Sequence, residues 1–182
     1  MTNRFEIRKL TEIALLIAIA FVLDLIASII PSPFLYGGSI SLAMLPIFVI
    51  GLRFDWKVGV LSGLALGFLS TLNNPYIIHP IQYLLDYPIA YGVVGLSGVF
   101  KDQTNRLGRF LAGIVLGSFL RYLAHGFSGI IFFSEYALME GKDPWVYSFI
   151  LYNLPYMAAS MAFCLIVGSI LWQRKLFQKN LH

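Results

Sequence analysis

The chain has 182 residues, of which 58% are hydrophobic and only 12% are charged. Soluble proteins are roughly 45–50% apolar and about 25% charged, and a chain of this size cannot hide such an apolar excess inside itself. The composition therefore excludes a soluble enzyme, a disordered linker and, because Cys164 is the single cysteine, a disulfide-stapled module. It indicates a protein whose solvent is lipid.

The net charge of +4 does not indicate a nucleic-acid-binding protein, because that function needs a basic face on a folded surface. Here long apolar stretches separate the basic residues, as in proteins with cations at the ends of membrane spans. The sequence also contains no Walker A loop, no nucleophile elbow and no metal-ligand spacing. We therefore expect no nucleic-acid partner, no catalytic residue, no metal and no cofactor for this chain.

Six apolar segments are candidates for membrane-spanning helices, each of which needs about 20 mostly apolar residues. The second and third segments are short, and the others have the length of a span. We predict an all-α integral membrane protein with six transmembrane helices, formed as a single domain over residues 1–182. In chain order, the segments cover residues 11–30, 39–52, 57–72, 80–100, 107–133 and 145–172.

Prolines and glycines mark boundaries and contacts of these segments. Pro31 and Pro33 end the first segment, because proline cannot continue a helix. Pro88 and Pro155 lie inside the fourth and sixth segments and predict a kink and an interruption. Glycines at four-residue spacing in the third and fifth segments predict that neighbouring helices approach closely; they are Gly59, Gly63, Gly67, Gly113 and Gly117.

The positions of lysine and arginine predict the orientation in the membrane. Eleven of the thirteen lysines and arginines lie at one end of the predicted helices, whereas the loops at the opposite end hold only Lys142. By the positive-inside rule both termini are therefore cytoplasmic, which an even number of spans allows. The cations on the predicted cytoplasmic side are Arg4, Arg8, Lys9, Arg53, Lys57, Lys101, Arg106, Arg109, Arg174, Lys175 and Lys179.

A few polar side chains fall inside the apolar segments, where a charged group costs about 2.5–3.5 kcal/mol on insertion scales. At 1.5 Å per residue, Asp86, His125 and Asn153 each lie on the order of 10 Å below the outer surface, although they belong to three different helices. Polar groups at one depth can meet. Together with nearby tyrosines and Trp145, which we expect to report on occupancy by fluorescence, they predict an outward-facing pocket for a flat, cationic ligand.

Each of these residues also has a structural alternative. Asp86 and Arg121 can neutralise one another as a buried pair, and His125 can be a hydrogen-bonded core histidine. The tyrosines can form an ordinary interfacial belt, and Asn153 can join two helices. Asp24 has no evident partner in the sequence and is read as structural or associated with the outer loops.

Several motifs resemble the thiamine-specific S component of energy-coupling factor (ECF) transporters. The resemblance covers the whole chain in length, order and span count. Its motifs are His-Pro-Ile-Gln-Tyr-Leu-Leu-Asp-Tyr-Pro at 79–88, Arg-Tyr-Leu-Ala-His-Gly-Phe-Ser-Gly at 121–129, Phe-Phe-Ser-Glu-Tyr-Ala at 132–137, Gly-Gly-Ser-Ile-Ser at 37–41, and Tyr-Ser with Tyr-Asn in 147–153.

This resemblance implies a multi-pass protein of a bacterial plasma membrane that captures extracellular thiamine. It further implies a transmembrane coupling protein and two ATPase subunits as partners, so that ATP is used by those partners. In the family, alanines four residues apart on the first helix form the docking surface, and Ala14 and Ala18 match them here. Small side chains of this kind permit close helix approach; an internal packing face is the alternative.

The resemblance also implies roles for the residues of the site. Asp86 would face the cationic thiazolium, with Arg121 holding that carboxylate in place. The aminopyrimidine would be read by His125, Tyr147 and Asn153, and the walls would be Tyr76, Tyr87 and Phe133. The chain departs from the family pattern by having Asp86 where a glutamate can occur, Arg121 for a lysine and Phe133 for a tryptophan.

Two other classes of function remain open. An S component for another vitamin or precursor, such as hydroxymethylpyrimidine or riboflavin, has less use for a carboxylate if its ligand is neutral. A small membrane enzyme could use Asp86 and His125 as an acid–base pair, but no nucleophile or metal set accompanies them. A channel is disfavoured because the polar groups share one depth and do not line a path.

Overall fold

The computed structural model describes residues 2–73, 75–103 and 106–174, and over these residues it contains helices and no strand. Segments α4, η1, α5 and η2 follow one another without a break, and η3 continues into α7, so the helices form six rods. The all-α prediction is confirmed. In chain order the elements are α1 (Thr2–Ile29), α2 (Met44–Arg53), α3 (Trp56–Ser70), α4 (Pro80–Leu84), η1 (Leu85–Ile89), α5 (Ala90–Gly92), η2 (Val93–Gln103), α6 (Leu107–Met139), η3 (Val146–Asn153) and α7 (Leu154–Gln173).

Four rods are long and apolar enough to cross a membrane, over Glu6–Ile29, Pro80–Lys101, Leu107–Met139 and Val146–Gln173. Helices α2 and α3 have 10 and 15 residues, fewer than the roughly 20 that a full span needs. Most residues of α2 are buried, and it packs against η2, α3 and α1. Helix α2 is therefore enclosed by protein, whereas α3 leaves Leu61 and Phe68 exposed on one face.

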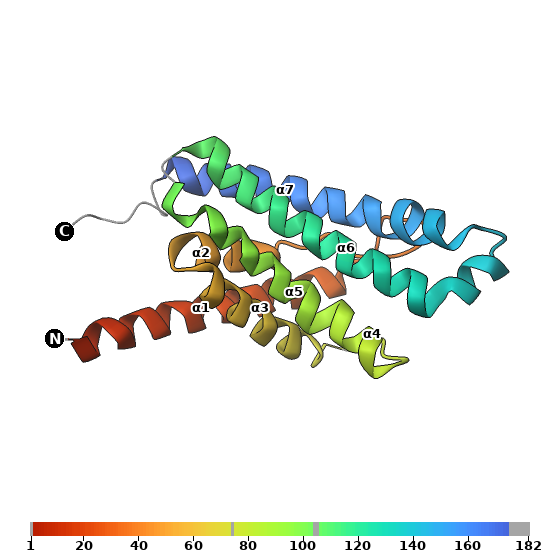
Figure 1. Cartoon of the computed structure of the whole chain (residues 1–182), viewed down its shortest axis with the longest axis horizontal. Helices are drawn as coiled ribbons and strands as arrows, with labels where there is room; N and C mark the ends of the chain where they lie inside the picture. The colour runs from red at the N-terminus through yellow and green to blue at the C-terminus, as the bar shows by residue number, and fades with distance from the viewer. Residues whose placement is uncertain (1, 74, 104–105, 175–182) are drawn as a thin grey trace.

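The rods lie side by side, and α1 begins at the same end of the molecule at which α7 ends (Figure 1). Helices α1, α2 and α3 contact one another, and α6 packs along α7. The rod from α4 to η2 contacts both α3 and α6 and so joins the two groups. The six rods thus bring both ends of the described chain to one side, as an even number of crossings requires.

Three of the predicted boundaries are wrong. The first helix begins at Thr2 and not at residue 11. The second helix begins at Met44 and not at residue 39, because Gly37 and Gly38 have φ angles of 102° and 84° and lead into an irregular segment. The fifth helix continues past residue 133 to Met139. It ends where Gly141 adopts a φ of 68°, and the N–H of Lys142 then donates to a carbonyl of the last helical turns at 2.9 Å.

The two proline-containing rods are distorted as their sequences predict. The expected kink at Pro88 is a π-helical turn, η1, and a second π-helical stretch, η3, ends directly before the turn that contains Pro155. Proline lacks the N–H that an α-helix needs at that position, so the backbone widens instead of breaking. Asp86 lies in the first wide turn and Asn153 in the second, so both distortions belong to the part of the fold that carries the predicted site.

The glycine stripe of α3 faces the rod from α4 to η2. A Cβ on Gly63 would overlap the backbone oxygen of Tyr91, and one on Gly67 would lie 2.5 Å from the Cα of Pro88. The two backbones therefore touch along this line, as the four-residue spacing predicts. The same rod is held on its other side by Gly117, whose Cβ would lie 2.7 Å from the oxygen of Val94.

We expect Gly63→Ala to destabilise the protein by about 1–3 kcal/mol, because the new methyl group forces the two backbones apart. Thermal unfolding in detergent measures the effect. The matched control is Gly108→Ala, since a Cβ on Gly108 meets nothing within 4 Å. Equal unfolding midpoints for the two variants would contradict the contact.

Candidate functional site

A cavity of about 500 Å³ lies between the helices, within the roughly 300–1,000 Å³ range of small-molecule sites. Its walls come from α1, the irregular segment after it, the first residue of α2, the end of α3, the loop before α4, the rod from α4 to η2, α6, η3 and α7. The structure brings all eight residues predicted for the site to this one cavity. They are Tyr76, Asp86, Tyr87, Arg121, His125, Phe133, Tyr147 and Asn153.

Three side chains hold the carboxylate of Asp86 in the cavity wall. Its Oδ2 accepts from Gln82 Nε2 at 2.7 Å and from Ser128 Oγ at 2.9 Å. Its Oδ1 lies 3.1 Å from His125 Nδ1. These three donors hold the carboxylate in one orientation. Its side chain is still 17% exposed, which leaves it open to the cavity.

The contacts of Arg121 determine how His125 is protonated. Arg121 Nε donates to His125 Nε2 at 3.3 Å, so Nε2 is the acceptor and Nδ1 carries the proton that is donated to Asp86. The guanidinium of Arg121 lies over the ring of Tyr91, 3.8 Å from its centroid. Arg121 therefore reaches Asp86 only through the imidazole.

The alternative of a direct pair between Asp86 and Arg121 is not realised. Among the residues that the structure describes, Asp86 Oδ1 has His125 Nδ1 as its partner, at 3.1 Å. The physical reason is that His125 lies one turn beyond Arg121 on α6 and occupies the space between the two charges. The alternative of a hydrogen-bonded histidine is thus also realised, in a residue that lines the cavity.

Asp24 has a partner that the sequence did not indicate. Its Oδ1 accepts a hydrogen bond of 2.5 Å from Tyr91 Oη, across 67 residues of sequence. Tyr91 is nearly completely buried, whereas Asp24 lines the cavity. The cavity wall therefore carries two carboxylates, Asp24 and Asp86, and one guanidinium.

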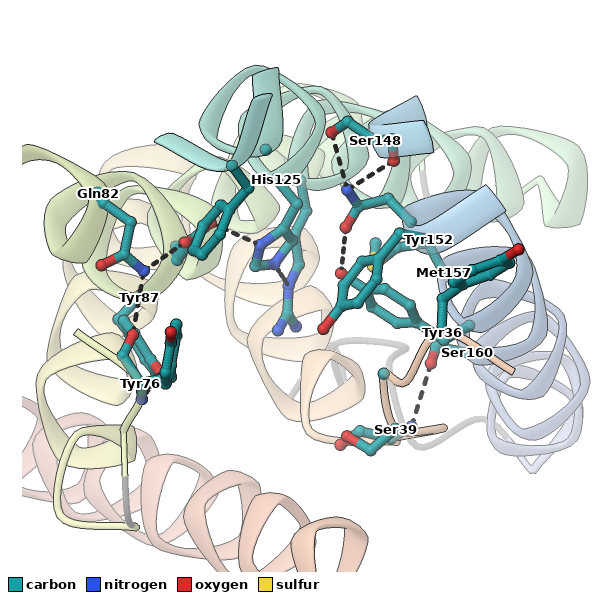
Figure 2. A pocket seen from close by; sticks show the side chains of 18 of the residues that line it. Tyr36, Ser39, Tyr76, Gln82, Tyr87, His125, Ser148, Tyr152, Met157 and Ser160 are labelled. Atoms are coloured by element: carbon teal, nitrogen blue, oxygen red, sulfur yellow. Dashed lines mark hydrogen bonds and ion pairs between the residues drawn. The ribbon is translucent and has the colours of Figure 1, made fainter. Parts of the chain in front are cut away.

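A second polar region lies where η3 meets α7. Asn153 Nδ2 donates to the backbone oxygen of Ser148 at 2.8 Å, and Asn153 Oδ1 accepts from Tyr156 Oη at 2.6 Å. Figure 2 shows Gln82, Tyr76 and Tyr87 on one side of the cavity and Ser148 and Tyr152 on the other. The acidic group around Asp86 and the amide group around Asn153 thus form two separate polar regions.

Aromatic rings connect the two polar regions. Tyr76 and Phe133 have ring centroids 6.1 Å apart, and Tyr87 Oη accepts from the backbone N–H of Tyr76 at 3.0 Å. Near the other region, Tyr147 lies edge-on to Tyr36, with centroids 5.3 Å apart. Such faces suit a flat ligand, and their negative π surfaces attract a cation.

Lys142 joins the two loops beside the cavity. Its Nζ lies 4.9 Å from the ring centroid of Tyr36 and 3.6 Å from Glu140 Oε2. The hydrogen bond to Tyr36 and the charge interaction with it, followed by the charge of Glu140, raise the pKa of the Lys142 ammonium above its usual value. Tyr36 belongs to the segment before α2 and Lys142 to the turn after α6, so this contact ties the two loops together.

Sequence reasoning missed several residues of the site. Gln82 precedes Asp86 by four residues and Ser128 follows His125 by three, so helical spacing could have found both. Tyr91 gave no comparable signal, since its role depends on contacts with α1 and α6. Trp145 is not among the residues that line the cavity, and its ring stacks on Phe149, so its fluorescence response to the ligand stays a prediction.

We expect Gln82→Leu to cost about 1–3 kcal/mol of stability, because Gln82 is 2% exposed and its loss leaves buried groups unpaired. Besides Asp86, its amide bonds the oxygen of Tyr76 at 3.1 Å and the N–H of Ile78 at 3.1 Å. Unfolding in detergent measures the change. Gln173→Leu at an exposed position is the control, and a loss no larger than the control's would contradict this role.

The fold and the cavity together define a class: a helical membrane protein with a charged and aromatic cavity of the size of a small-molecule site. The chain belongs to the family described as "Thiamine transporter protein (Thia_YuaJ)", whose pattern matches residues 10–179. It is a multi-pass transport protein of a bacterial plasma membrane.

Individual relatives agree with the family. The chain is 36% identical to the thiamine transporter ThiT of Bacillus subtilis (strain 168), with 94% of each chain covered. It is 27% identical to the thiamine transporter ThiT of Lacticaseibacillus paracasei, with 72% of each covered. Among solved structures, that of ThiT from Listeria monocytogenes is similar with a TM-score of 0.75 and 30% identity, covering 94% of this chain and 98% of the other.

Proposed function

We propose that this chain is the thiamine-binding S component of an ECF-type importer and that it captures thiamine from outside the cell. The observation that carries the proposal is the hydrogen-bonded carboxylate of Asp86 in a cavity walled by aromatic rings. Family membership and the names of the relatives support thiamine as the ligand.

The charge of the cavity suits a cation. Two carboxylates and one guanidinium line it, and His125 is neutral in the tautomer that its hydrogen bonds define, so the lining carries one net negative charge. Thiazolium is permanently positive and needs no proton transfer. A fixed carboxylate and π faces in a region of low dielectric hold such a group without chemical change.

The amide region would receive the aminopyrimidine. Ring nitrogens and an exocyclic amine need both donors and acceptors, which the hydroxyls of Tyr147 and Tyr156 and the amide of Asn153 supply. Because Asn153 is already tied to Ser148 and Tyr156, it is held in place before the ligand arrives. Tyr76, Tyr87 and Phe133 would form the walls beside the bound rings.

The chain would act without enzymatic activity, as a single domain that depends on partner subunits for energy. No nucleotide-binding motif occurs in the sequence, which suits a division of labour with a coupling protein and two ATPases. Ala14 and Ala18 are both exposed on α1, as a docking surface for another helix requires. The proposed cytoplasmic side carries the cation clusters; Lys175 and Lys179 of that set lie outside the described residues.

We expect isothermal titration of the purified protein in detergent to show saturable thiamine binding, and Asp86→Asn to weaken it by roughly 10- to 100-fold. This is the loss of one charge-assisted contact of about 1.5–3 kcal/mol. Hydroxymethylpyrimidine, which lacks the cation, should be affected much less. Titration is preferred to tryptophan fluorescence because Trp145 does not line the cavity.

The matched control for this experiment is Asp55→Asn. Asp55 caps α3 by accepting from the N–H of Lys57 at 2.7 Å, a role that asparagine also fills, and it does not line the cavity. Riboflavin binding with no response to thiamine would favour the S component for another vitamin. Conversion of thiamine by the purified protein would favour the enzyme.

We expect replacement of Ala14 and Ala18 by leucine to leave thiamine binding unchanged and to abolish uptake in cells that contain the coupling module, because bulky side chains prevent close helix approach. Uptake of labelled thiamine measures the effect. Ala158 and Ala162 on α7 are also exposed and four residues apart, so their replacement by leucine is the control. Unchanged uptake in the α1 variant would count against docking there.

A further inference from the structure

Asp24 is the one charged residue of the cavity wall for which the proposed function provides no role. It lies in the last turns of α1 and is held by Tyr91 Oη from α5. The ring of Tyr91 in turn carries the guanidinium of Arg121 from α6, and the charge of Asp24 attracts that guanidinium. Three helices therefore meet through Asp24, Tyr91 and Arg121.

Arg121 lies close enough to Asp86 to compete with a cationic ligand for its carboxylate. Its Nε is separated from Asp86 only by the imidazole of His125, to which both groups are hydrogen-bonded. If Arg121 paired directly with Asp86, the carboxylate would be neutralised and a cationic ligand would lose its counter-ion. The observed position of the guanidinium over Tyr91 prevents that pair.

We propose that Asp24 is a positioning residue that, with Tyr91, holds Arg121 away from Asp86 and so keeps the Asp86 carboxylate available for the cationic end of the ligand. The inference rests on the proposed function for the ligand and on the geometry alone for the position of Arg121. Asp24 thereby determines that the cavity prefers a cation to a neutral ring of the same shape.

The physical basis is the cost of an unpaired charge within the membrane-spanning region. A guanidinium there is stabilised by a nearby anion together with a π face, and Asp24 and Tyr91 supply the two. When Asp24 is made neutral, Asp86 becomes the remaining carboxylate of the described cavity wall. The arginine side chain is long and flexible, so moving past His125 costs less than remaining without a counter-ion.

The first test is the crystal structure of the ligand-free Asp24→Asn variant. We expect the guanidinium of Arg121 within about 4 Å of the Asp86 carboxylate, the distance of an ion pair. An Arg121 that still lies over Tyr91 overturns the proposal. This result does not depend on which ligand the protein binds. Failure of the proposed function would instead be seen as absence of thiamine binding by the unmodified protein, so the two failures can be told apart.

The second test compares ligands by titration calorimetry. In Asp24→Asn the affinity for thiamine should fall at least tenfold, and the affinity for hydroxymethylpyrimidine should fall much less. Adding Arg121→Met should remove the difference between the losses of the two ligands, because no cation remains to occupy Asp86. Tyr91→Phe keeps both charges but removes the bond to Asp24, and it should give a smaller loss of the same kind.

The outcomes divide clearly. Equal losses for thiamine and hydroxymethylpyrimidine would show that Asp24 serves only to hold α1 against α5, and would overturn the proposal. The same conclusion follows if the loss stays selective for thiamine after Arg121→Met is added to Asp24→Asn. A preserved thiamine affinity in Asp24→Glu, which retains the charge one methylene further out, would support the positioning role.

Discussion

The structure depends on keeping one carboxylate ionised and accessible inside a protein that is otherwise built for lipid. Asp86 can remain there because Gln82, Ser128 and His125 donate to it from two different rods. Each donor must itself be held: Gln82 by the backbone of the preceding loop, and His125 by Arg121. The carboxylate of Asp86, in a region of low dielectric, thus requires hydrogen-bond donors at several nearby positions, and these donors need partners of their own.

The backbone is shaped to bring those neighbours together. The wide turns at η1 and η3 carry Asp86 and Asn153. The glycines of α3 and α6 allow these two helices to pack closely against opposite sides of the rod from α4 to η2. In a membrane the apolar side chains gain little by leaving lipid, so close backbone contact is the main source of helix association. The glycines of α3 and α6 therefore position the rod that carries Asp86.

Separation of charge explains how the cavity can select a ligand. The guanidinium of Arg121 and the carboxylate of Asp86 are linked through a neutral imidazole, and Asp24 holds the far end of this chain through Tyr91. The amide group around Asn153 is satisfied by its own neighbours on η3 and α7. Both polar regions are therefore organised by the protein before a ligand enters, which lowers the cost of binding.

The sequence by itself determined the solvent, the helical class and the depth of the polar residues, because apolar run length and proline position are local properties of a chain in lipid. Depth was enough to bring Asp86, His125 and Asn153 to one cavity. Depth alone could not decide which polar groups pair, since pairing depends on the rotation of each helix about its axis and on distances of a few tenths of a nanometre between helices. Only the tertiary structure placed His125 between Arg121 and Asp86 and gave Asp24 its partner in Tyr91. It did so because a buried charge takes the partner that packing brings within hydrogen-bonding distance.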